Sequence, residues 1–476
     1  MRKKTLAILV LGGLIASCSD FVDIDSPTTV RQDSYFRSVS DFTAAVNGMY
    51  NGLRGYYSSF YLLAEIPSDN AQINGYTLAQ GPLDQLNWLP STAEIQNQWV
   101  NAYSIIARCN TILERIEQFD MDPGLKRQYQ GEARFTRALV YFNLVRFFGD
   151  VPLVLKSIES EEEAYTFLRA PVQDVYSQIK SDLLFAADNL PGKYDSNNTG
   201  RATSGAALSL LGKVYMTNGE FDQALPVVNQ VVTSNLYKLL PDYEKVFDIG
   251  NKHNEEIIFD IQYLGGAGFG EGSNFSIVFA PAGSGTEITS GGSPGSANSG
   301  TLDLYNAFEA GDLRKKTAIA FWPSPDSLYY TLKFKDRPIA ANEGKNNWPV
   351  IRYADVLLLL SEAQNETGDV AGALKSLNQV RARAGLTALN GGGQAELRQA
   401  IQRERRVELC FEGHRWFDLL RTGTMLSTMR SYKEKYLRYG GYLVVNYDIT
   451  DNKVLFPIPF REVSVNPGLV QNPGYR

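Results

Sequence analysis

The chain has 476 residues, 44% of them hydrophobic, and a formal net charge of −6. This composition is that of a globular protein, and the length allows one large core or two to three ordinary domains. An acidic chain without a long basic run cannot neutralise a phosphate backbone, so nucleic acid is not expected as a partner. A polymeric ligand should be neutral, or matched by a local positively charged patch.

The first 17 residues have the pattern of an export signal. A basic start, residues 2–4, precedes an apolar stretch, residues 6–15, that is too short to cross a bilayer as a helix. Residues 15–18, Ile-Ala-Ser-Cys, resemble the lipobox of bacterial lipoproteins, in which a peptidase cuts before the cysteine and the thiol is acylated. We predict that Cys18 carries the lipid and that residues 18–40 form a flexible tether. The alternative is an ordinary signal peptide with a chance cysteine.

Helical periodicity dominates residues 41–240, the first of two predicted regions. Apolar residues recur three and four positions apart, and proline or glycine marks several ends. The pattern predicts three long helices over Thr92–Phe119, Leu125–Phe148 and Val172–Leu190.

An internal repeat follows these helices. Residues 208–225 match the tetratricopeptide pattern, with Gly212 and Ala224 small where two helices approach and Gly219 at the turn. A second copy spans residues 357–374. Because two copies are too few for a stable solenoid, residues 95–148 should supply more diverged helix pairs. The predicted fold is mostly α, with helix pairs packed against a loop-rich half that has a few short strands.

The second predicted region, residues 241–476, has a loop-rich insert over residues 264–350. Its first part, Leu264–Gly300, is crowded with glycine and serine and is predicted to be loop that buries no core. Residues 56–91 are similarly irregular. Short strands are predicted at Glu256–Gln262 and Val454–Ile458. Long loops in compact domains are often functional.

No catalytic or metal site emerges from the motifs. The two histidines, His253 and His414, are far apart, and no metal-binding spacing occurs, so no metal or cofactor is predicted. Residues 291–295 fit G-x-S-x-G, but in a glycine-rich loop rather than the strand–turn–helix that a hydrolase needs. Two carboxylates would suffice for glycosidase chemistry, and no such pair stands out. The chain is predicted not to be an enzyme.

Charged residues and cysteines are given structural interpretations. Glutamates interleaved in Arg398–Arg406 predict an ion-paired helix face rather than a basic patch. His414 is predicted to be a packed structural residue. Cys109 and Cys410 are predicted to be buried free thiols, with a single bridge between them as the alternative.

Four segments resemble the SusD/RagB family, namely residues 131–153, 351–366, 403–421 and 456–475. The resemblance implies a SusD-like α-α superhelix of about four tetratricopeptide-like helix pairs. It implies a lipid-anchored protein on the outer face of the outer membrane, acting as a lid over a SusC-like TonB-dependent transporter. The ligand would be an oligosaccharide, or a peptide as in some members. The arginines and glutamates of these segments would form buried ion-paired networks.

Ligand contacts are predicted in loops that carry aromatic and amide side chains. A sugar stacks its C–H face on an aromatic ring, while Asp and Asn side chains hydrogen-bond its hydroxyls. The candidates are Asp69, Asn70, Asn74, Tyr76, Trp88 and Trp322, and Trp348 is a further loop aromatic. For each of them a packing role is the alternative. The predicted function is capture of glycans at the cell surface. A tetratricopeptide-type lipoprotein for peptide or protein ligands, and a surface hydrolase, are the rival hypotheses.

Overall fold

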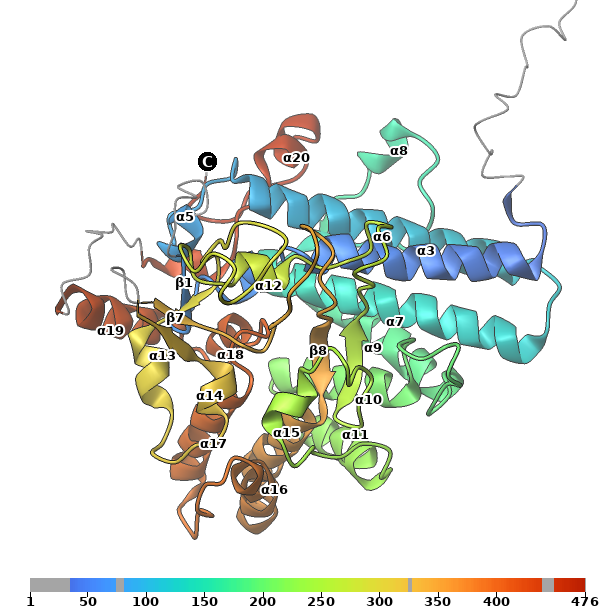
Figure 1. Cartoon of the computed structure of the whole chain (residues 1–476). Helices are drawn as coiled ribbons and strands as arrows, with labels where there is room; N and C mark the ends of the chain where they lie inside the picture. Colours follow the sequence, from blue (N-terminus) through green and yellow to red (C-terminus); the bar gives the residue numbers. More distant parts are fainter. Residues whose placement is uncertain (1–34, 74–80, 324–327, 439–448, 476) are drawn as a thin grey trace, which may run out of the picture. The chain divides into compact units, whose positions relative to one another are not determined.

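The structure is a computed structural model of the chain that describes residues 35–73, 81–323, 328–438 and 449–475 (Figure 1). Residues 1–44 and residues 45–476 form two separate units. Helix α3 (Val39–Tyr57) runs from the first unit into the second. Cys18 lies outside the described residues. Within them, no helix combines the length and apolar character that a membrane span requires.

Long helices make up most of residues 93–233, as predicted. They are α6 (Ala93–Glu117), α7 (Pro123–Phe148), α9 (Val172–Asn189), α10 (Ser204–Thr217) and α11 (Phe221–Thr233). Helix α7 begins where the Asp122 carboxylate accepts the N–H of Leu125, with Pro123 in the first turn. It ends at Gly149, whose φ of 72° is left-handed. Each of these helices packs against the next one along the chain.

Helices α10 and α11 form the first predicted helix pair. A Cβ atom at Gly212 would lie 2.3 Å from Cγ2 of Val228, so only glycine allows α10 to approach α11 this closely. Ala224 is fully buried on the other side of the contact, and Gly219 makes the turn with a φ of 72°. The first tetratricopeptide-like pair is therefore confirmed.

The second predicted pair consists of α15 (Tyr353–Glu366) and α16 (Val370–Arg383). The Ser361 hydroxyl on α15 donates to the carbonyl of Ala373 on α16 at 2.7 Å. Helix α15 also packs against α11 and against α17 (Gln394–Glu408), so the two pairs form one continuous stack (Figure 1). The fold is mostly helical with few short strands, as predicted.

Short antiparallel strands organise the loop-rich half. Four of them form a sheet in the order β1-β5-β7-β6, with β1 at Ala71–Gln72, β5 at Ser299–Gly300, β7 at Leu328–Tyr330 and β6 at Ala320–Trp322. Two short helices, α13 (Leu302–Ala307) and α14 (Lys315–Ala318), lie beside this sheet (Figure 1). Strand β4 (Ile257–Ile261), which was predicted, pairs with β8 (Trp348–Arg352), and β2 (Val151–Pro152) pairs with β3 (Arg169–Ala170).

The glycine-rich segment does bury a core, contrary to the prediction. Phe275, at the start of α12 (Phe275–Val278), and Phe279, directly after it, are buried and pack on Phe334 with ring centroids 5.3 and 5.2 Å apart. The glycines allow close backbone packing, because a Cβ at Gly265 would lie 2.1 Å from the carbonyl oxygen of Glu343. In this segment the glycines therefore allow two backbone segments to pack closely, in addition to forming loops.

The remaining elements are short or lie near the C-terminus. They are α4 (Tyr61–Ala64), α5 (Gly81–Asp84), α8 (Glu161–Ala164), η2 (Tyr243–Val246), α18 (Arg415–Arg421), α19 (Met425–Arg438), η3 (Asp451–Val454) and α20 (Phe460–Val465). The predicted strand at Val454–Ile458 is wrong: only the Phe456 N–H bonds to neighbouring backbone, at the Phe147 carbonyl. Helices α4 and α5, together with strand β1, interrupt the stretch 56–91 that was predicted to be irregular.

Cys109 and Cys410 are free and buried, which confirms the preferred prediction over a bridge. Burial raises the pKa of each thiol to about 12. Both thiols therefore stay protonated at neutral pH and behave as small apolar side chains.

Candidate ligand-binding site

Two predicted ligand residues, Asp69 and Asn70, are buried in scaffold contacts instead. The Asp69 carboxylate pairs with Arg415 at 2.7 Å and with Arg406 at 2.9 Å. Burial raises the pKa of Asp69, but the two guanidinium groups outweigh burial and lower the pKa to about 2. Asn70 accepts a hydrogen bond from Arg406 at 2.8 Å. Neither side chain is available to a sugar in this structure.

Trp88 is also buried, with 0% of its surface exposed. Its ring lies 4.4 Å from Phe456 and 6.1 Å from Trp416, and its Nε1–H donates to the Tyr475 hydroxyl at 2.7 Å. Trp348, another predicted loop aromatic, lies fully buried in β8. The packing alternative therefore holds for both tryptophans. Sequence could not decide this, because the C-terminal residues that enclose Trp88 are almost 400 positions away.

The other three predicted residues have different outcomes. Asn74 and Tyr76 lie outside the described residues. Trp322 is half-exposed on β6, the edge strand of the four-stranded sheet. It is the one predicted aromatic in the described part of the chain with an accessible face.

An aromatic surface that sequence analysis missed is formed by Phe321 on β6, Tyr329 on β7 and Tyr305 on α13. Phe321 is 47% exposed and pairs across the hairpin with Tyr329, their rings 5.4 Å apart. Tyr305 on α13 continues the row 4.6 Å from Tyr329, with interplanar angles of 34° and 50° along the row. Two aromatic pairs, at residues 321–322 and 329–330, flank the Pro-, Ser- and Asp-rich residues 323–327. This was the available signal, because aromatic runs on either side of such a cluster are typical of two strands joined by a turn.

Charged side chains border this aromatic surface. The Lys315 ammonium lies 3.5 Å from the centroid of the Tyr305 ring. Asp303, on the same helix as Tyr305, accepts from Arg406 at 2.9 Å and from Lys435 at 3.0 Å. A tilted row of rings with neighbouring donors and acceptors suits a ligand that has both apolar C–H faces and hydroxyl groups.

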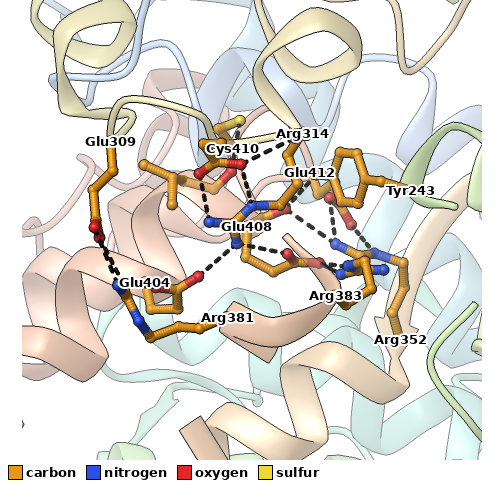
Figure 2. Close-up of polar contacts among 12 residues, drawn as sticks. Tyr243, Glu309, Arg314, Arg352, Arg381, Arg383, Glu404, Glu408, Cys410 and Glu412 are labelled. Carbon is orange, nitrogen blue, oxygen red and sulfur yellow. Dashed lines mark hydrogen bonds and ion pairs between the residues drawn. The ribbon is translucent and has the colours of Figure 1, made fainter. Parts of the chain in front are cut away.

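A buried ionic network lies between the repeats and the loop-rich half, as the family resemblance implied. Figure 2 shows Glu408 accepting from Arg314 at 2.9 Å, from Arg352 at 3.1 Å and from Arg383 at 2.5 Å. Burial raises the pKa of Glu408, but the three guanidinium groups hold it well below its ordinary value. The network joins basic and acidic side chains, namely Arg314, Lys333, Arg352, Arg381, Arg383, Glu256, Glu309, Asp312, Glu404, Glu408 and Glu412.

The arrangement of this network is that of a scaffold. Every carboxylate in it has at least one cationic partner, so none is poised as a free acid or base. His414 packs against Lys213, with Nδ1 and Nζ 3.0 Å apart, and burial with this ammonium lowers the His414 pKa to about 3. Ser293 lies in a segment without helix or strand. The described residues contain no group of three His, Cys, Asp or Glu side chains that could hold a metal ion.

The stacked helix pairs and the accessible aromatic surface define a helical-repeat binding protein. Two family profiles match the chain: that of the SusD family over residues 315–475, and one described as "Starch-binding associating with outer membrane" over residues 20–216. The chain belongs to the SusD family. Members of this family are non-catalytic, and the chain is accordingly not an enzyme.

Individual relatives match along nearly their whole length. SusD-like protein P25 of Formosa agariphila is 27% identical, and the alignment covers 97% of each chain. The starch-binding protein SusD of Bacteroides thetaiotaomicron is 23% identical, over 92% of this chain and 89% of the relative. Among solved structures, a laminarin-binding SusD-like protein superposes with a TM-score of 0.79 at 28% identity, covering 92% of this chain and all of the other.

Proposed function

We propose that the chain is a surface lipoprotein that captures oligosaccharides and delivers them to a SusC-like TonB-dependent transporter in the outer membrane. The observation that carries glycan capture is the row of rings formed by Phe321, which is 47% exposed, and by the partly exposed Tyr329 and Tyr305. Two similar proteins, one that binds starch and one that binds laminarin, support the same ligand class. The transporter partner and the surface location are supported by the family and by the lipobox-like residues 15–18.

Replacing Phe321 by alanine should weaken binding of an oligosaccharide about tenfold without changing the stability of the protein. Stacking of a sugar on an aromatic ring contributes roughly 1–1.5 kcal/mol, and Phe321 is half-exposed, so its removal leaves little cavity. The measurement is isothermal titration of the mature chain with laminarin and starch oligosaccharides, together with a thermal melt.

Phe460→Ala is the matched control, since Phe460 is 62% exposed on α20, away from the sheet. Equal oligosaccharide affinity for the Phe321→Ala variant and the parent would refute the aromatic surface as the binding site. Titration with unrelated peptides separates glycan capture from the peptide-binding alternative, which would be favoured if peptides alone bound.

Lipid attachment is tested at Cys18. Cells that express the chain in a lipoprotein-processing bacterium and are fed labelled palmitate should incorporate label into the parent protein, and none into Cys18→Ser. The parent should fractionate with the outer membrane and be cleaved by protease added to intact cells, whereas the variant should not fractionate with that membrane. Label in the serine variant would contradict acylation at this thiol.

A further inference from the structure

A pocket lined with arginine side chains lies between helices α17, α18 and the start of α19. Its volume is about 240 Å³. The pocket is bordered by one carboxylate, that of Asp418, and by five guanidinium groups, those of Arg403, Arg405, Arg406, Arg415 and Arg421. Five arginines around one pocket are unusual in a chain whose net charge is −6, and solubility alone does not require them.

The two inner arginines are neutralised by their surroundings. Arg405 pairs with Asp355 at 2.8 Å and with Asp418 at 3.2 Å. Arg421 pairs with Glu362 at 2.5 Å and with Asp418 at 2.8 Å. Asp418 thus pairs directly with these two guanidinium groups and with none of the other three.

The three outer arginines keep donors that no protein acceptor uses. Arg406 and Arg415 share the carboxylate of Asp69, and Arg406 also pairs with Asp303 at 2.9 Å. Among the described residues both arginines donate only through Nε and Nη2. Arg403 is exposed and forms no hydrogen bond or ion pair with the part of the chain that the structure describes. The prediction of an ion-paired face on α17 therefore fails at Arg403.

Neutral donors complete the lining of the pocket. Gln399 and Gln402 come from α17, one helical turn apart, and lie on the same face as Arg403 and Arg406. Thr424 directly precedes α19 and Thr428 lies in its first turn, at the end of the helix where the dipole is positive. Guanidinium, amide and hydroxyl donors around one cavity match an acceptor with several oxygens.

We propose that this arginine pocket binds an oxyanion, the carboxylate or sulfate group of a small ligand such as an acidic sugar. Hydrogen bonds from a guanidinium to a carboxylate or a sulfate are charge-assisted, and the unused Nη1 groups of Arg406 and Arg415 each supply one such donor. The volume is just below the ~300–1,000 Å³ of typical ligand pockets, which suits one sugar residue or a free anion rather than a chain segment. No residue of the pocket belongs to the aromatic surface, so the two sites are tested separately.

The test is isothermal titration of the mature chain at low ionic strength with sodium sulfate, sodium glucuronate and glucose. At least one of the two anions should bind saturably, and glucose should not compete. Arg403→Gln should weaken anion binding about tenfold, because it removes one charge-assisted donor. Gln402→Glu, which places a carboxylate in the pocket, should weaken it at least as much. Arg127→Gln, at an exposed arginine on α7, is the matched control and should bind as the parent does.

The two anions distinguish the sources of the group. Binding of glucuronate in preference to sulfate assigns a carboxylated sugar, and the reverse assigns a sulfate. Absence of saturable binding by both anions would overturn the proposal, and so would equal affinity of the parent, Arg403→Gln and Gln402→Glu. Phe321→Ala should leave anion binding unchanged, so failure of the glycan proposal and failure of this one give different results.

Discussion

Arg352→Leu is expected to lower the free energy of unfolding by about 3–5 kcal/mol, the usual cost of removing one partner from a buried ion pair. Arg352 is 1% exposed and contacts Glu256 at 2.6 Å, Glu408 at 3.1 Å and Glu412 at 2.7 Å. The leucine variant leaves these carboxylates with fewer cations in a site that water does not reach. The measurement is urea denaturation followed by both circular dichroism and tryptophan fluorescence.

Lys238→Gln is the matched control for this variant. Lys238 pairs with Glu255, but both side chains are about 60% exposed, so the control should change stability by less than about 1 kcal/mol. An Arg352→Leu variant whose free energy of unfolding lies within about 1 kcal/mol of that of the parent would contradict the prediction. Leucine would then substitute for the ion pairs by apolar packing, and the network would serve specificity of the fold rather than its stability.

Trp88→Ala should destabilise the protein by about 3–5 kcal/mol, as expected for truncation of a buried aromatic side chain. The substitution removes contacts with Phe456 and Trp416 and leaves the Tyr475 hydroxyl without the indole donor. Because the ring has no exposed face, oligosaccharide affinity measured below the melting temperature should stay unchanged.

The neighbouring residue Leu89 provides the control, since its side chain is 62% exposed and Leu89→Ala should be close to neutral. A Trp88→Ala variant that melts like the parent but loses oligosaccharide binding would show that Trp88 binds the ligand and is not a packing residue.

Local patterns in the sequence were sufficient for the helical frame. The signals that end helices and pair them act between residues close together in the sequence. Examples are the proline at the first position of α7, the glycine at its end, and the small residues Gly212 and Ala224 on either side of one turn. Periodicity therefore predicts α6, α7 and α9 to within a few residues of their observed ends. A buried ionic network around Glu404, Glu408 and Glu412 was implied by the family resemblance, and it agrees with the rule that a buried charge requires a partner. The partners themselves lie in other segments of the chain.

Only the tertiary structure decided which aromatic and acidic side chains are accessible. Asp69 was predicted to contact the ligand, but in the structure its carboxylate pairs with Arg406 and Arg415, which are more than 300 positions away in the sequence. Phe321 lies on the surface because β6 is an edge strand, and strand order depends on pairings between distant segments. Burial is the sum of contacts from the whole chain, whereas helix formation depends on neighbours along it. The sequence by itself therefore determined the repeats, and long-range packing determined the binding surfaces.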